Sequence, residues 1–246
     1  MTQVAAASAK LIGKTVARDA LPNAQREQMY GLLSTFFSGV ERQTFHDDLC
    51  DKTHVILLED EGGTLRGFST LLVYRTAVPG VDAMIVYSGD TIVDRAWWGS
   101  PSLAVSWLAA ARALTAGSGT RDVYWLLLTS GFRTYRFLPV FWREFYPRFD
   151  ALYEGKALTD ALARERFADR YDEANGVVRF GRPQVLVPEL LEVPQGRTHD
   201  PHVAFFLSRN PGHVNGDELV CLTNIADTNL TSAGRRIARS VERAAP

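Results

Sequence analysis

The sequence predicts an α/β protein in which a mixed, mostly antiparallel sheet is flanked by helices. Segments rich in β-branched and apolar residues alternate along the chain with segments whose apolar residues recur at helical spacing. The turn at residues 60–63, Asp-Glu-Gly-Gly, joins two strand-like segments as a hairpin, which makes these strands antiparallel. At 246 residues, with 46% hydrophobic and 22% charged residues, the chain has the composition of an ordinary globular protein.

The N-terminal part is expected to begin with a strand over residues 10–18. A helix follows from residue 21, is N-capped by Asn23 and is ended by Gly39. The apolar residues of this helix recur at helical spacing and form one stripe: Met29, Leu32, Leu33, Phe36 and Phe37. A second helix over residues 41–50 and the two hairpin strands over residues 53–59 and 65–78 come next.

Residues 81–114 form the centre of the predicted fold. Their first part is a β-branched, apolar strand that Gly89 and Asp90 interrupt, so we expect a bend or a bulge there. The last part has the apolar spacing of a helix, with Ser100 as a suitable N-cap and Pro101 at the first helical position. A strand that enters a helix through a tight turn presents free N–H groups, which favour anions.

The rest of the chain is predicted to contain a buried strand over residues 122–129 and an aromatic segment. Because Pro139 disfavours helical geometry at Leu138, a helix is expected only over residues 139–147. A helix over residues 158–171, an irregular proline-rich segment over 176–196, two strands over 203–207 and 218–225, and a helix over 231–243 follow. His202 and His213 would face each other across the two strands.

The kinked strand, Val93-Asp94, the turn with Gly99 and the following helix resemble the acyl-CoA site of GNAT-type N-acyltransferases. The resemblance implies a GNAT-like domain over residues 1–150 and a C-terminal extension over residues 151–246 that packs on it. In that family the kinked strand splays from its neighbour, pantetheine enters the opening, and the pyrophosphate meets the amides of the turn. The usual turn has an Arg or Gln and glycines spaced two apart. This chain keeps only Gly99, and Pro101 has no N–H.

The resemblance implies transfer of an acyl group from a thioester to a small-molecule amine. The donor would be acetyl-CoA, a longer acyl-CoA or an acyl carrier protein, and aromatic residues such as Trp97 and Phe141 would line an acyl slot. The residues placed at the donor by the resemblance are Val93, Trp98, Gly99, Ser100, Ser102, Leu103 and Ser130. The alternative of a GNAT-like domain that binds a ligand or a protein without catalysis stays open.

Two residues are candidates for catalysis. Asp90, at the kink, would lie beside the thioester and deprotonate the amine or hold it as an ammonium, unless it only builds the bulge. Tyr135 lies near the place where many members of the family have a tyrosine that protonates the leaving thiolate, although it also sits among core-like aromatics. Strand alternation places Ser88 and Asp90 on one face and Tyr87 on the other.

Composition and patterning exclude other classes of function. A net charge of −1 gives no reason to expect nucleic acid, no run approaches the roughly 18 apolar residues of a membrane helix, and the N-terminus lacks the pattern of a signal peptide. Two cysteines and five histidines without ligand spacing predict neither a disulfide framework nor a metal site. The two cysteines without a disulfide framework suit a reducing cytosol, so a cytoplasmic protein is expected. A bacterial source is expected because arginine greatly outnumbers lysine, as in GC-rich genomes; a homodimer is left open.

Overall fold

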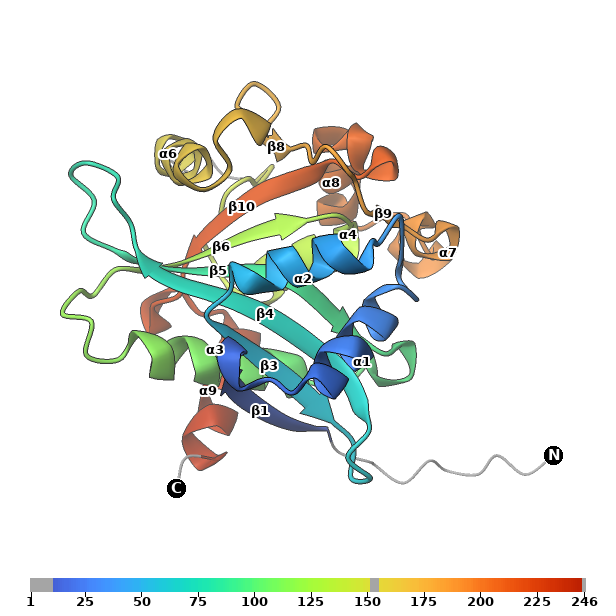
Figure 1. Ribbon diagram of the computed structural model, residues 1–246. Helices are drawn as coiled ribbons and strands as arrows, with labels where there is room; N and C mark the ends of the chain where they lie inside the picture. Colours follow the sequence, from blue (N-terminus) through green and yellow to red (C-terminus); the bar gives the residue numbers. More distant parts are fainter. Residues whose placement is uncertain (1–10, 151–154, 245–246) are drawn as a thin grey trace.

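The computed structural model describes residues 11–150 and 155–244, so Lys10, the expected start of the first strand, lies outside the described residues. An eight-stranded sheet in the order β1-β3-β4-β5-β6-β10-β8-β7 runs through this part of the chain (Figure 1). Only β5 and β6 are parallel; all other neighbours are antiparallel. These strands are β1 (Ile12–Ala17), β3 (His54–Glu59), β4 (Leu65–Arg75), β5 (Met84–Val93), β6 (Val123–Thr129), β7 (Tyr171–Asp172), β8 (Val177–Val178) and β10 (Glu218–Asn224). The predicted fold class is confirmed.

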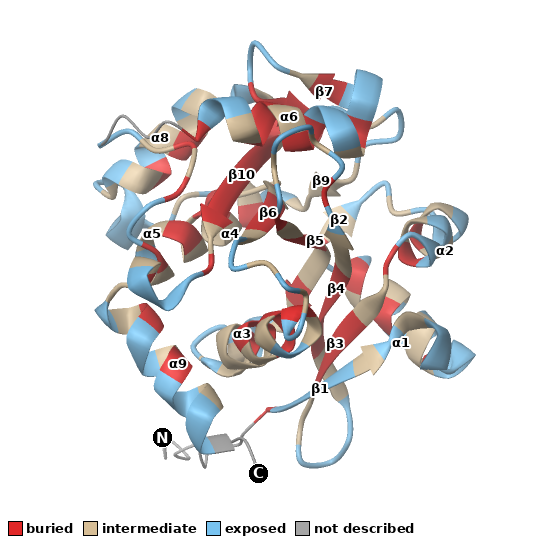
Figure 2. Ribbon diagram, turned by 90° about the vertical axis from the view of Figure 1, so that its left-hand side faces the viewer, coloured by how far each residue is buried: buried red, intermediate tan, exposed pale blue. Residues whose placement is uncertain are grey.

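Helices cover both sides of the sheet (Figure 2). On one side, here called the α2 face, lie α1 (Asn23–Leu33), α2 (Arg42–Cys50) and α6 (Lys156–Phe167). On the other, here called the α3 face, lie α3 (Ser102–Thr115), α4 (Phe132–Tyr135), α5 (Phe137–Phe141), α8 (Pro201–Arg209) and α9 (Ser232–Ala244). Strand alternation separates the two cores: in β3, Leu57 packs with α1 and α2, whereas Ile56 packs with α3. A small sheet pairs β2 (Phe37–Ser38) with β9 (Val185–Leu186), and the short α7 (Pro188–Leu191) follows.

The last third of the chain takes part in the main sheet. β10 lies between β6 and β8, and its register with β6 runs from Leu219 opposite Thr129 to Asn224 opposite Tyr124. α9 crosses the α3 face and packs against both α3 and α5. The C-terminal segment therefore supplies both a strand beside β6 and a helix over the α3 face. Both elements reach the site described below.

Several predicted elements are wrong in the structure. Residues 203–207 lie in α8, not in a strand, because Asp200 accepts the N–H of His202 (3.0 Å) and Pro201 occupies the first turn, which together start a helix. His202 thus lies on α8 and His213 in the 3-10 turn after it, so they do not face each other across strands. Instead of a helix over residues 139–147, the chain forms α4 and α5 earlier and is extended from Trp142.

The first helix also differs from the prediction at both ends. It ends at Leu33, well before Gly39, because the chain leaves the helix to form β2 against β9. Its N-cap position is Pro22, and Asn23 is already helical. Phe36 is nevertheless buried in the core beside Leu33, so the apolar stripe holds although the helix does not continue through it.

Candidate active site

A bulge interrupts β5 at the predicted place. Ser69 of β4 pairs with Thr91 and Leu71 pairs with Ser88, so Gly89 and Asp90 together stand opposite the single residue Thr70. Both residues of the bulge therefore point to the same side as Thr70, which is the α2 face. The prediction from strict alternation, that Asp90 lies on the same face as Ser88, is therefore wrong, because the extra residue of the bulge turns Asp90 to the α2 face.

The parallel strands β5 and β6 separate where this bulge begins. Their register runs from Met84 opposite Val123 to Ser88 opposite Leu127 and then stops. From Gly89 onward β5 keeps only β4 as a neighbour, and β6 continues with β10. Within the described residues, the two inner edges of the opening thus have no partner strand. A kinked strand that separates from its parallel neighbour is the arrangement that the resemblance to GNAT-type N-acyltransferases implies.

A cavity of about 720 Å³ extends through this opening, with walls from both faces of the sheet. This volume is within the range of sites that bind small molecules and cofactors. Its polar arm lies on the α2 face and includes Asp48, Lys52, Asp90, Arg166 and Glu218. Its apolar arm lies on the α3 face and includes Leu103, Trp107, Leu108, Trp125, Phe141, Trp142, Leu230 and Ile237. A ligand that occupies both arms must pass between β5 and β6.

Three carboxyl groups in the polar arm, those of Asp48, Asp90 and Glu218, have raised pKa values, because burial disfavours their charged forms. Burial raises the pKa of Asp90 to about 6, and the charge of Lys52 opposes this rise. Burial also raises the pKa of Glu218 to about 7, with a further rise from the charge of Asp90, while a hydrogen bond with Ser130 lowers it. A carboxylate with a pKa near neutrality is suited to act as a general base. Asp90 has the place and the titration range that such a base requires.

Lys52 closes the polar arm from α2. Its ammonium donates to the carbonyl of Asp48 (2.7 Å) and lies 5.6 Å from the ring centroid of Tyr87. Burial lowers the pKa of Lys52, and the charge of Asp90 opposes this effect. A Cβ at Gly89 would lie 2.6 Å from the Cε of Lys52, so the glycine in the bulge leaves the space that Lys52 occupies.

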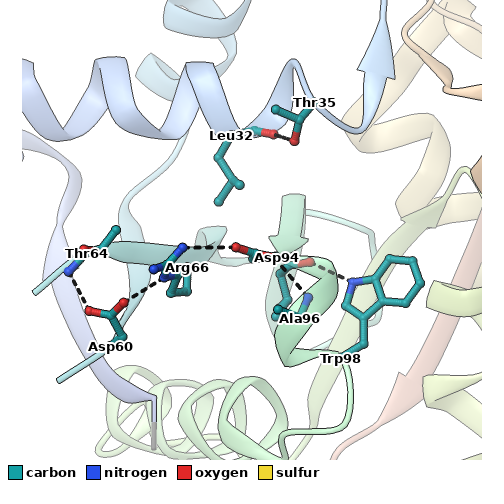
Figure 3. Close-up of polar contacts among 9 residues, drawn as sticks. Leu32, Thr35, Asp60, Thr64, Arg66, Asp94, Ala96 and Trp98 are labelled. Carbon is teal, nitrogen blue, oxygen red and sulfur yellow. Dashed lines mark hydrogen bonds and ion pairs between the residues drawn. The ribbon is translucent and has the colours of Figure 1, made fainter. Parts of the chain in front are cut away.

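The turn between β5 and α3 uses most of its own N–H groups (Figure 3). The side chain of Asp94 accepts the N–H of Ala96 (3.1 Å), and its carbonyl accepts that of Trp97 (2.8 Å). Ser100 donates its N–H to the carbonyl of Trp97, and its hydroxyl accepts the N–H of Ser102 (3.2 Å). The N-cap of α3 is Pro101 and the first helical residue is Ser102, so the predicted start of this helix, with Ser100 as the N-cap, is one residue too early. Arg66 bridges Asp60 and Asp94 at 2.8 and 3.3 Å. The turn consequently presents few free amides and an anionic side chain where a pyrophosphate would bind.

The cavity contacts most of the residues predicted to bind the donor. Its lining includes Val93, Trp98, Ser100, Leu103 and Ser130. Gly99 and Ser102 are not part of the lining that the described residues form; the hydroxyl of Ser102 donates to the carbonyl of Leu11 (3.2 Å). The indole of Trp98 donates to the carbonyl of Val93 (2.8 Å) and its ring is 44% exposed.

Two arginines flank the Trp98 end of the cavity. The guanidinium of Arg133 lies 5.3 Å from the centroid of Trp98, and that of Arg95 lies 5.8 Å from the centroid of Phe36. Burial lowers the pKa of Arg133, and the charge of Arg95 lowers it further. In the described part of the chain neither arginine has an ion pair with a carboxylate. By contrast, Arg136 pairs with Asp200 (2.8 Å).

Tyr135 lies away from these groups. It is fully buried, its hydroxyl donates to the carbonyl of Pro147 (2.9 Å), and its ring packs against Phe145 and Phe206. It does not line the cavity formed by the described residues. Sequence reasoning missed Lys52 and Glu218, for which the only local signals are a lysine at the end of a helix and a glutamate at the start of a strand.

Two further properties bear on the site. Among residues 11–150 and 155–244, there is no group of three His, Cys, Asp or Glu side chains that could hold a metal ion. In the same residues, none of the helices combines the length and apolar character needed to cross a bilayer.

A search of protein-family models and a search of curated proteins each find no match to this sequence. Solved structures do resemble it. The GNAT family N-acetyltransferase YhbS from Escherichia coli, in complex with CoA, is 18% identical with a TM-score of 0.39, over 53% of this chain and 69% of that chain. Glucosamine-6-phosphate N-acetyltransferase from Arabidopsis thaliana is 14% identical with a TM-score of 0.34, over 46% and 81%. A probable N-acyltransferase of unknown function from Enterococcus faecalis V583 is 11% identical with a TM-score of 0.41, over 88% and 66%. Each is a partial likeness and assigns no activity to this chain.

Proposed function

We propose that this protein transfers an acyl group from a CoA-type thioester to a small-molecule amine. The observation that carries this proposal is the cavity that passes between the splayed strands β5 and β6, with Asp90 at its polar side. A thioester in the opening would place its carbonyl beside the bulge, and the amine would reach it from the polar arm.

The reaction needs one proton acceptor and no metal. The carboxylate of Asp90 takes a proton from the acceptor ammonium, and the free amine attacks the thioester carbonyl. A C–N bond forms and the C–S bond breaks, so the products are an amide and a thiol. The leaving thiolate takes the proton held by the Asp90 carboxyl. The nitrogen then gives its second proton to the regenerated Asp90 carboxylate, which releases it to solvent, so one proton is released for each ammonium that is acylated. Lys52 keeps Asp90 ionised near neutral pH, because its charge lowers the pKa of that carboxyl.

The donor is expected to bind along the opening between the strands. Backbone N–H and C=O groups on a free strand edge bond to an extended ligand that carries amides, as pantetheine does. Since the turn before α3 has few free amides, Arg95 and Arg133 are the better candidates to bind the donor's phosphates. Both CoA and an acyl carrier protein carry a phosphopantetheine arm.

The runner-up is a domain that binds a thioester or another ligand without catalysis. The raised pKa values of Asp90 and Glu218 favour the enzyme, since strongly shifted pKa values concentrate at functional sites. Mass spectrometry of a panel of primary amines incubated with acyl-CoA or acyl carrier protein separates the two functions. N-acylated products support the enzyme, and donor binding without any product supports the binding domain.

The donor site is tested by calorimetric titration with acyl-CoA. Arg133→Ala should weaken binding by about 10- to 100-fold, because a charge-assisted hydrogen bond to phosphate is lost. Arg112→Ala is the matched control, since Arg112 pairs with Asp227 and does not line this cavity. Absence of binding by the unaltered protein to either kind of donor would contradict the proposed function.

A further inference from the structure

The apolar arm is a chamber on the α3 face. Three tryptophans form one wall: the ring centroid of Trp107 lies 4.4 Å from that of Trp125, and that of Trp142 lies 5.0 Å from Trp125. Each of the three is only 5% exposed, so the wall belongs to the core. The opposite wall comes from Ile237 of α9 and from Leu230, which precedes this helix. A ligand that also occupies the polar arm beside Asp90 reaches this chamber through the opening between β5 and β6.

The position of α9 fixes the far end of the chamber. A Cβ at Gly234 would lie 2.4 Å from the carbonyl oxygen of Phe141, so this glycine lets α9 approach α5 closely. The chamber is thus bounded by α3, β6, α5 and α9 and is lined by aromatic and aliphatic side chains. Apolar cavities of this kind hold water poorly and bind apolar ligands. An acetyl group at the opening would leave these walls uncovered.

One polar group in the wall lacks a partner. Ser88 accepts hydrogen bonds from the indole N–H groups of both Trp107 and Trp125, each at 2.9 Å. The Nε1 of Trp142 is buried and has no hydrogen-bond partner among the described residues. A buried donor without a partner is costly, and native cores rarely contain one without a reason. The ring of Trp142 lines the chamber, whereas its Nε1 lies beneath the surface that a ligand would touch.

We propose that the chamber binds the acyl chain of the donor and that the protein prefers a medium- or long-chain acyl thioester over acetyl. This inference rests on the proposed function, because the thioester must sit in the opening beside Asp90. The chain then extends past Ser88 to the α3 face, and the acceptor amine occupies the polar arm.

Binding of decanoyl-CoA and acetyl-CoA to the unaltered protein tests the proposal, with calorimetry and tryptophan fluorescence as readouts. We expect decanoyl-CoA to bind at least about tenfold more tightly, since each buried methylene contributes roughly fourfold. Decanoyl-CoA should also change the fluorescence of the buried tryptophans, which acetyl-CoA should leave nearly unaltered. Equal affinities with no fluorescence change would contradict binding of the acyl chain in the chamber and would leave the proposed function intact. Failure of both thioesters to bind would instead contradict the proposed function.

Two variants test where the acyl chain of the donor binds. Ile237→Trp fills the end of the chamber, so it should lower the affinity ratio of decanoyl-CoA to acetyl-CoA by about tenfold or more. Ser240→Trp, on the exposed side of the same helix, is the matched control and should leave the ratio unchanged. An unchanged affinity ratio of decanoyl-CoA to acetyl-CoA in a folded Ile237→Trp protein would mean that the acyl chain binds outside this chamber.

Discussion

Asp90 combines a position at the bulge of β5 with a pKa near 6, and its ionisation should control the chemistry. Asp90→Asn keeps the size of the side chain and removes the proton acceptor. We expect kcat for amide formation to fall by about 10²- to 10⁴-fold, the usual contribution of a general base. Donor affinity, measured by calorimetry on the same variant, should change little. A variant with full activity would assign Asp90 to the bulge alone.

Lys52 should set the pH at which this base works. The rate of the unaltered enzyme is expected to fall as pH decreases through about 6, because the protonated Asp90 cannot accept a proton. Lys52→Met removes the cation that lowers the pKa of Asp90, so the acid limb of the pH profile of kcat/KM should move to higher pH. An acid limb that stayed in place would show that another group titrates there.

At the scale of elements, the bulge depends on Gly89. A Cβ there would lie 2.6 Å from both the Cε of Lys52 and the Oγ1 of Thr70. Gly89→Ala should therefore reduce the free energy of unfolding by roughly 1–3 kcal/mol, the usual cost of overpacking. Gly99→Ala is the control, because nothing lies within 4 Å of its Cβ position. Urea denaturation measures both; equal stabilities would mean that Lys52 moves aside without strain.

Elements with strong local signals could be predicted from the sequence. The hairpin turn after Glu59 and the Gly89-Asp90 interruption each occur where local turn chemistry indicated them. The strand predicted around Val203 and Phe206 was wrong, because a short apolar run does not distinguish a strand from a helix. Here Asp200 at the N-cap and Pro201 in the first turn start a helix. The prediction of a helix over residues 139–147 was wrong, because the backbone of Tyr146 instead forms hydrogen bonds with that of Leu222 in β10, which is distant in sequence.

At the scale of the whole molecule, only part of the site could be read from the sequence. Asp90 and the Trp98 turn lie in one continuous stretch whose pattern resembles a family, so they were candidates from the start. Glu218 and Ile237 reach the cavity only because β10 pairs with β6 and α9 crosses α3. No local pattern encodes that pairing. The C-terminal third thus supplies one titrating group of the polar arm and one wall of the apolar arm.

The raised pKa values of Asp90 and Glu218 should also make the stability of the whole protein depend on pH. The pKa of Asp90 rises from 3.8 to about 6 and that of Glu218 from 4.5 to about 7. Between these limits the folded protein binds more protons than the unfolded chain, so both groups contribute stability at low pH that is lost as pH rises.

Glu218→Gln removes the contribution of Glu218 to this pH dependence. The loss of unfolding free energy between about pH 5 and pH 8 should shrink by the order of 1–3 kcal/mol. Urea titrations at both pH values measure it, with Glu189→Gln, outside the cavity lining, as the control. An unchanged difference would mean that Glu218 ionises freely in the folded protein. If the difference shrinks, the site keeps its carboxyls at a cost in stability, as expected of groups retained for function.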